Sequence, residues 1–266
     1  MPTKNKKPIE LVKKPTLEGS YHGKDAYRLA GKRTLSMVFI AIAYLMLGLM
    51  GALDSDVLRI LISVGVVVVL FFYQYSAGVS QGETDSAYGE IMYARKQEGK
   101  TVTPIDHDKC YHPLKGYFAT VVGMAPYMLL AIVFAFMAKL PTYSLGVLPA
   151  WTESYMLHGE MADSLAYYQH SMHIQTVDVL RILVRCMIMP FINIASCLGS
   201  VAVLWVERFS ALLLLIAPLG YGVGYRNGLV ARMKINTGIK IGVAKKRKKA
   251  RKEKMARQKK SPERLI

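Results

Sequence analysis

The sequence predicts an all-α integral membrane protein with four transmembrane helices in two hairpins, plus an amphipathic or re-entrant helix on the outer side. Two observations carry this prediction. Hydrophobic residues make up 52% of the 266 residues. They gather in blocks of about twenty, the length that crosses a hydrocarbon core about 30 Å thick. The net charge of +17 is concentrated at the two ends of the chain, which predicts that both ends lie in the cytoplasm.

The two ends are predicted to be basic tails. Residues 1–33 hold nine Lys or Arg against three acidic residues, and residues 226–266 hold sixteen against Glu253 and Glu263. Blocks of like charge favour a solvated segment that seeks an anionic surface, either lipid headgroups or RNA. The three cysteines form no C-x-x-C pair, so neither a disulfide framework nor a structural zinc site is expected.

The first hairpin covers residues 34–79. Its first helix, 34–53, is uncharged, and its second helix, 57–79, carries only Arg59, which is close enough to the helix end to reach the interface. The loop at 80–116 is polar and basic, so the positive-inside rule places it in the cytoplasm. We expect its first part to extend the second helix by several turns before the segment Gly99–Pro104 breaks it.

A third uncharged block at 117–138 predicts the next crossing, with Pro126 as a kink. The segment 139–178 carries Lys139 as its single basic residue against four acidic ones, which places it outside. A short helix is expected near 154–173.

The last apolar region allows two topologies. Residues 186–205 and 209–225 are both uncharged. Counting both as crossings gives five spans and puts the basic tail outside, against the charge bias. We therefore predict an interfacial or re-entrant segment at 179–205, a final transmembrane helix at 209–228 and a polybasic cytoplasmic tail at 229–266. Asp178, Arg181 and Arg185 form one polar stripe on this outer helix. The five-span arrangement is the alternative.

A short pattern occurs twice. Tyr75-x-x-Gly78-x-x-x-Gly82 recurs as Tyr221-x-x-Gly224-x-x-x-Gly228. Each copy sits where a predicted span leaves the membrane for a basic cytoplasmic segment. The pattern is consistent with a parallel duplication of a two-helix unit.

Small residues spaced four apart indicate a helix-packing face. Such a face can bind a partner helix or pack inside the chain, and the internal contact between the two copies is the favoured interpretation. The candidate residues are Gly78, Gly82, Gly220, Gly224 and Gly228.

The basic run in the C-terminal tail is the candidate electrostatic site. Anionic lipid of the cytoplasmic leaflet is its expected partner, and ribosomal RNA is the alternative. No aromatic residue interleaves to stack on bases. The run consists of Lys245, Lys246, Arg247, Lys248 and Lys249.

Three weaker groups complete the candidates. Arg185, Asn193, Ser196 and Ser200 would line a polar cavity if the 179–205 segment enters the membrane. Asp163, His170 and His173 share one face of the predicted outer helix and are weak candidates for a metal or pH-sensing site. The stretch 106–112 also gathers carboxylates, imidazoles and a thiol. A solvated loop is the favoured interpretation of the outer His/Asp group and of the stretch 106–112, so no metal and no cofactor is predicted.

No catalytic residue is predicted, because the chain has no Gly-rich nucleotide loop, H-E-x-x-H or G-x-S-x-G motif. The leading hypothesis is a non-catalytic subunit or scaffold of a membrane assembly, with a membrane-protein partner or a second copy of itself. The alternatives are a transport or membrane-insertion component, and an outer-face enzyme that uses the His/Asp group. The expected location is a cell membrane, by default the bacterial plasma membrane.

Overall fold

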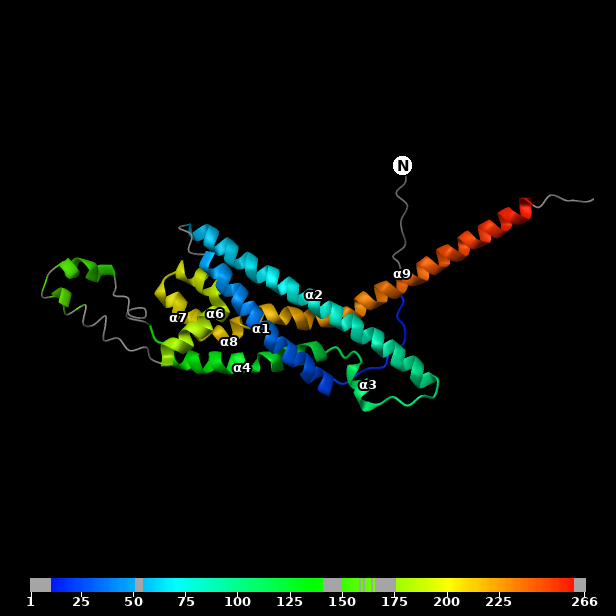
Figure 1. Ribbon diagram of the computed structural model, residues 1–266, viewed down its shortest axis with the longest axis horizontal. Helices are drawn as coiled ribbons and strands as arrows, with labels where there is room; N and C mark the ends of the chain where they lie inside the picture. The colour runs from blue at the N-terminus through cyan, green and yellow to red at the C-terminus, as the bar shows by residue number, and fades with distance from the viewer. Residues whose placement is uncertain are drawn as a thin grey trace, which may run out of the picture.

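A computed structural model describes residues 11–50, 55–140, 150–157, 159, 161–163, 165 and 176–260, and every regular element in this part of the chain is helical (Figure 1). Four helices are long and apolar enough to cross a membrane: α1 (Lys24–Met50), α2 (Asp56–Gln97), α4 (Lys115–Met137) and α6 (Thr176–Ser196). The all-helical class and the apolar helices expected at the first three blocks are confirmed.

The remaining elements are shorter, apart from the last. A bend of 68° separates α7 (Ser200–Arg208) from the chain that follows it, and the two together are also apolar enough to cross. The list is completed by α3 (Pro104–Lys109), the 3-10 helix η1 (Ala150–Leu157), α8 (Ser210–Leu213) and α9 (Ile216–Lys260).

Helix α2 runs for 42 residues, well past the predicted end of its span at residue 79. It ends at Gln97, and Gly99 then adopts a positive φ of 76°, a conformation that favours glycine. Thr103 caps α3 by accepting a hydrogen bond from the Asp106 amide, and Pro104 occupies the first turn. The predicted helical extension and its break are therefore both present.

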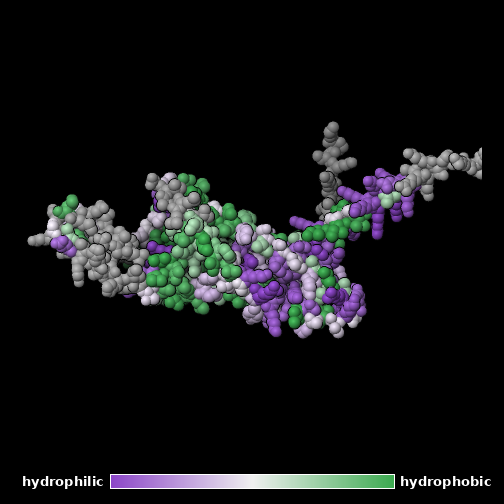
Figure 2. Space-filling model, viewed as in Figure 1, coloured by the Kyte–Doolittle hydropathy of each residue, from purple (hydrophilic) through white to green (hydrophobic). Residues whose placement is uncertain are grey.

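The apolar and polar parts of the molecule are separated along its long axis. Figure 2 shows a hydrophobic block over the region of α1, α2, α4 and α6, and hydrophilic surface toward α3 and along the end of α9. Large side chains such as Phe39, Phe72 and Phe136 are 61–90% exposed on the apolar helices. Apolar surface of this kind fits a lipid environment better than water.

We name the two ends of the helix bundle by their contents. At the hairpin end, α1 stops, α2 starts and α4 stops. At the tail end, α2 stops, α3 follows and α4 starts. Arg181, near the start of α6, donates to the Lys139 carbonyl just after α4, at 2.6 Å. Asn193, near the end of α6, donates to the Gly48 carbonyl in α1, at 3.3 Å. Both ends of α6 therefore contact the hairpin end.

Helix α6 is bent and then reversed. Ile188 has non-helical dihedrals (φ −123°, ψ 19°) two residues before Pro190. Proline lacks an amide hydrogen and crowds the carbonyl four residues earlier, so it accounts for the kink. Gly199, with φ 102°, forms the turn into α7. The α6–α7 pair is thus a short helical hairpin.

Candidate functional site: a clamped basic helix

The last helix, α9, consists of two unlike parts. We call residues 216–237 the root, because they pack against the other helices, and residues 238–260 the rod. Every side chain from 238 to 255 is exposed, and the rod projects from the body in Figure 1 as the orange-to-red helix. The rod holds twelve Lys or Arg and one Glu. At 1.5 Å per residue it is about 34 Å long.

Glycines hold the root against α2. A Cβ added at Gly224 would overlap the carbonyl oxygen of Tyr75, and one added at Gly78 would overlap the carbonyl oxygen of Tyr221. A Cβ added at Gly82 would overlap the carbonyl oxygen of Tyr225, and one added at Gly228 would overlap the backbone of Gly82. The two copies of the repeated pattern therefore pack on each other reciprocally, tyrosine backbone against glycine. Because the backbones touch at these positions, the two helices approach more closely than side chains would allow.

The glycine face is consequently occupied inside the chain. Gly220, the remaining glycine of the predicted set, lies against the Phe71 carbonyl in the same interface. Further along α9 the situation changes: Gly238 and Gly242 have no described atom within 4 Å of an added Cβ. Close glycine packing therefore stops where the rod begins.

Ionic contacts clamp the root beyond the glycines. Arg232 of α9 binds two carboxylates of α2, Glu83 at 3.1 Å and Glu90 at 2.9 Å. Asn236 donates to the other oxygen of Glu90 at 2.6 Å. Hydrogen bonds to charged groups are stronger than neutral ones. These contacts fix the rotation and height of α9 on α2 immediately before the rod.

The segment that precedes α1 crosses over the same region. The Val12 amide donates to the hydroxyl of Thr237 at 2.9 Å. The Leu17 amide donates to the Gly89 carbonyl of α2, and the Gly19 amide donates to the Tyr111 carbonyl. Residues 11–23 therefore form a strap that ties the end of the root to α2 and to the loop after α3. The sequence predicted a solvated tail here, because the segment is rich in charged residues and its main-chain hydrogen bonds leave no pattern in the sequence.

A buried ion cluster lies beside the root. Lys115, the first residue of α4, is completely buried. Its ammonium group donates to Asp25 of α1 at 2.8 Å and to Asp85 of α2 at 3.0 Å. The third contact is with the Asp108 carbonyl of α3, at 2.9 Å. An ammonium group has three hydrogens, so all its donors are used.

The carboxylate of Asp85 joins this cluster to α9. It accepts a hydrogen bond from the hydroxyl of Tyr225 at 2.6 Å and from the Gln81 amide at 2.8 Å, in addition to Lys115. Tyr111 stacks on Tyr225 with the ring centroids 5.5 Å apart and donates to the Arg226 carbonyl. Helices α1, α2, α3 and α4 thus meet the root of α9 at one hydrogen-bonded centre. Such a network supports a structural role, in which it holds these helices together.

The stretch 106–112 lies against this centre. Hydrogen bonds from Tyr88 and Thr103 hold the pKa of Asp106 below its usual value. Burial raises the pKa of the Cys110 thiol to about 11, so the thiol is neutral and a poor nucleophile at physiological pH. Within the described residues no group of three or more His, Cys, Asp or Glu side chains is placed to hold a metal ion. The stretch serves the packing of the loop.

A second ion cluster lies at the hairpin end. Glu207 of α7 is fully buried and binds Arg185 at 2.6 Å and Arg181 at 3.4 Å. Its other oxygen has no hydrogen-bond partner in the described part of the chain. Arg185, a predicted cavity residue, is therefore engaged by a carboxylate of its own chain. The contact joins α6 to α7 across the hairpin.

The other predicted cavity residues lie along the same hairpin. Asn193 contacts the Gly48 carbonyl, and Ser196 donates to the Asn193 carbonyl at 2.8 Å. Ser196 also accepts a hydrogen bond from Arg59 of α2 at 3.4 Å. Ser200 is exposed at the first turn of α7. Asn193 and Ser196 therefore connect α6 to α1 and α2.

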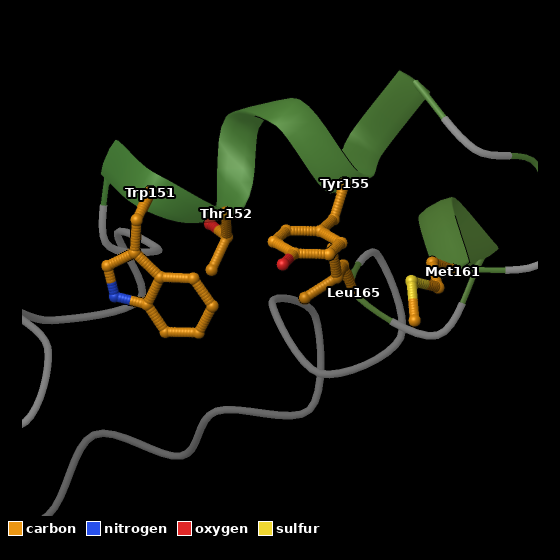
Figure 3. A pocket seen from close by; sticks show the side chains of 5 residues that line it. All are labelled: Trp151, Thr152, Tyr155, Met161 and Leu165. Carbon is orange, nitrogen blue, oxygen red and sulfur yellow. The ribbon is translucent and has the colours of Figure 1, made fainter.

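The predicted outer metal group is only partly described. Asp163 is exposed, whereas His170 and His173 lie outside the described residues. Residues 159, 161–163 and 165 are helical, within the region in which a short helix was expected, and they follow η1. Close to it is a pocket of about 300 Å³ lined by Trp151, Thr152, Tyr155, Met161 and Leu165 (Figure 3). None of these five side chains is an acid, a base or an imidazole.

Sequence reasoning named Arg181 and Arg185 but missed their partner Glu207 and the three charged side chains of the first cluster. Asp25, Asp85 and Lys115 each stand in polar sequence and resemble ordinary loop charges. Glu207 was assigned to a connection between two apolar blocks. One signal could have found Lys115. It directly precedes an uncharged stretch of 23 residues, and a charge at the start of such a helix needs a partner when it is buried.

No known protein family, curated protein or solved structure matches this chain. Its function is therefore argued from these contacts.

Proposed function

We propose that this protein is a non-catalytic, multi-pass membrane scaffold that holds a rigid basic helix at its tail end for a phosphate-rich partner. One observation carries the proposal. Helix α9 is a single 45-residue helix whose root is clamped by glycines, ion pairs and the strap, and whose rod is exposed on every side. A helix fixed at one end and free at the other presents its surface at a defined place.

The contacts of the buried charges support a scaffold more than an enzyme. Lys115 and Asp85 have their hydrogen-bonding positions filled by groups of the same chain. Acid–base and nucleophilic catalysis need such groups within reach of a substrate. A buried cluster with filled positions stabilises one arrangement of helices.

The transport alternative is less well supported. It requires Arg185 and Asn193 to face a polar cavity that attracts anions. Arg185 is bound to buried Glu207, and Asn193 bridges to the backbone of α1. Both side chains hold the α6–α7 hairpin in place, so the scaffold accounts for more of the polar contacts.

The partner proposed for the rod follows from the distribution of its charges. Successive helix residues are 100° apart, so the five consecutive basic residues 245–249 already point to all sides of the helix. An interfacial helix needs one apolar face to enter the lipid headgroup region. The exposed Ile239, Ile241 and Val243 lie only at the start of the rod, and Ala250 and Met255 do not continue an apolar face through its basic part. A partner that offers phosphates on more than one side of the rod, as nucleic acid does, fits better than a flat leaflet.

The experiment measures binding of the detergent-solubilised chain to a nucleic-acid duplex over a range of salt concentrations. Each phosphate contact contributes about −0.9 to the slope of log affinity against log salt. We expect replacement of residues 245–249 by glutamine to reduce the magnitude of that slope by about four. The matched control neutralises five exposed charges on the body at the same end: Lys13, Lys14, Arg95, Lys96 and Lys100.

The outcomes separate the alternatives. Equal losses in the rod variant and the body variant would show that only net charge matters, and the proposal would be wrong. Tighter binding to anionic vesicles than to the duplex would assign the rod to the cytoplasmic leaflet instead. Purification of the chain from its own membrane should give an anionic partner, and this partner should dissociate over the same range of salt concentration as the duplex.

A further inference from the structure

We infer that the groove between α1 and α2 binds one anionic phospholipid, with its phosphate at Lys32 and Arg33. The groove is a pocket of about 430 Å³ between the two helices. Its lining changes from basic to apolar along α1: Lys32 and Arg33 at one end, then Leu35 and Phe39. This inference uses the membrane placement assumed by the proposed function, but it concerns different residues from the rod.

Arg33 is the central observation. Its guanidinium group donates to the Gln74 side chain at 3.0 Å and lies 4.1 Å from the centroid of the Tyr221 ring. Gln74 is itself buried and donates to Ser36 at 2.7 Å. These contacts fix the guanidinium on the floor of the groove. They are all with uncharged groups.

The described part of the chain therefore offers no ion-pair partner for Arg33. No carboxylate in the described part of the chain forms an ion pair with Arg33 or with Lys32. The Nε of Arg33 is buried and has no hydrogen-bond partner there either. A partly buried cation without an anion is unfavourable. An anion from outside the chain would complete the site.

The position of the groove identifies the anion as a lipid headgroup. Arg33 directly precedes the predicted span, so its charge lies at the level of phosphates when α1 crosses the membrane. Deeper in the groove, Leu35 and Phe39 are 60% and 65% exposed, and Leu70 of α2 lies opposite them. An acyl chain would cover this apolar surface. Basic pockets between membrane helices on the cytoplasmic side have the same chemistry.

The test measures lipid binding to the delipidated full chain in dodecyl maltoside, by native mass spectrometry and by the shift in melting temperature. The ligands are phosphatidylglycerol, phosphatidylcholine and inorganic phosphate. We expect one tightly bound phosphatidylglycerol per chain, and weaker binding of the other two. Equal binding of phosphatidylcholine would overturn the anionic site, and equal binding of inorganic phosphate would overturn the lipid assignment.

Two substitutions locate the site. Lys32→Gln removes a charge from an exposed side chain and should weaken phosphatidylglycerol binding about fivefold. Arg33→Gln should weaken it further, although it also removes the contacts to Gln74 and Tyr221. Arg28→Gln is the matched control, because Arg28 is exposed on the same helix and does not line the groove. Unchanged binding by Lys32→Gln, or an equal loss in Arg28→Gln, would overturn the inference.

The rod variant separates this inference from the proposed function. Replacement of residues 245–249 by glutamine should leave phosphatidylglycerol at one per chain. Loss of the bound lipid in that variant would place the lipid on the rod and overturn the groove site. Lys32→Gln should in turn leave nucleic-acid binding by the rod unchanged.

Discussion

The root and the rod of α9 are parts of one continuous helix, yet they are stable for different reasons. The root contains three glycines of the packing face at positions where glycine is a poor helix former, and its helix is held by close contact with α2. The rod is composed mainly of Lys, Arg and Ala, which favour helix intrinsically, but its like charges repel one another. Tertiary contact thus maintains the first part, and local preference maintains the second.

This difference predicts which substitutions in α9 alter stability and which alter binding. A change in the root acts on packing and buried charge, so it should alter the stability of the whole bundle. A similar change in the rod alters an exposed surface, so it should alter binding and leave stability nearly constant. Paired substitutions along and around the same helix test this contrast.

The largest effect is expected at the ion cluster that holds the root. Lys115→Met leaves Asp25 and Asp85 buried without a cation, and removal of one partner of a buried ion pair costs about 3–5 kcal/mol. Lys252→Met in the rod should change stability by less than about 0.5 kcal/mol. Thermal unfolding in detergent measures both variants. A Lys115→Met protein as stable as the wild type would show that the cluster is dispensable.

The next effect concerns the glycine face. Gly224→Leu places a side chain where the Tyr75 carbonyl lies, and overpacking of this kind costs typically about 1–3 kcal/mol. Gly238→Leu has open space around it and should be neutral or stabilising by up to about 1 kcal/mol, since leucine favours helix. Melting temperature and size-exclusion profile report both variants. If the two glycines tolerate leucine equally, the helix contact described here is wrong.

The smallest effect leaves stability unchanged and concerns thiol reactivity. Cys110 has a pKa of about 11 because it is buried, and only its thiolate reacts. A cysteine introduced into the rod by Gly242→Cys should have a pKa of about 8.5 or lower, because it is exposed among lysines, so its thiolate fraction at pH 8 is at least roughly 200-fold larger. Peptide-mapped maleimide labelling measures both rates. Labelling of Cys110 should increase as the pH rises toward 11, and rapid labelling at pH 8 would contradict its burial.

The sequence predicted the apolar helices because their signal is local. The described part of the block at 34–53 lies within α1, and the block at 117–138 lies in α4 except for its last residue, which caps the helix. The start of α1 was missed by ten residues, since Lys24 to Arg33 continue the helix with charged side chains. The polybasic tail was expected to be a solvated segment, whereas the structure makes it helical as far as Lys260.

The candidate site was harder to predict because its residues are distant in the sequence. The reciprocal glycine contact could be anticipated, since the Tyr75 and Tyr221 copies share one spacing. The ion cluster joins residues 25, 85 and 115, and no local pattern links them. The pair of Arg185 and Glu207 depends on the reversal at Gly199, which a count of apolar residues does not reveal.

The strap has a consequence for how the molecule is made. Val12 and its partner Thr237 are 225 positions apart. At typical synthesis rates the hydroxyl that the Val12 amide binds is made roughly 10 to 45 s after Val12 itself. Throughout that interval the strap cannot complete its contacts. The hydrogen bond from Tyr225 to Asp85 likewise cannot form until Tyr225 has been synthesised. The tail end therefore closes only when the last helix arrives, so a chain truncated before residue 225 should leave this end of the molecule open.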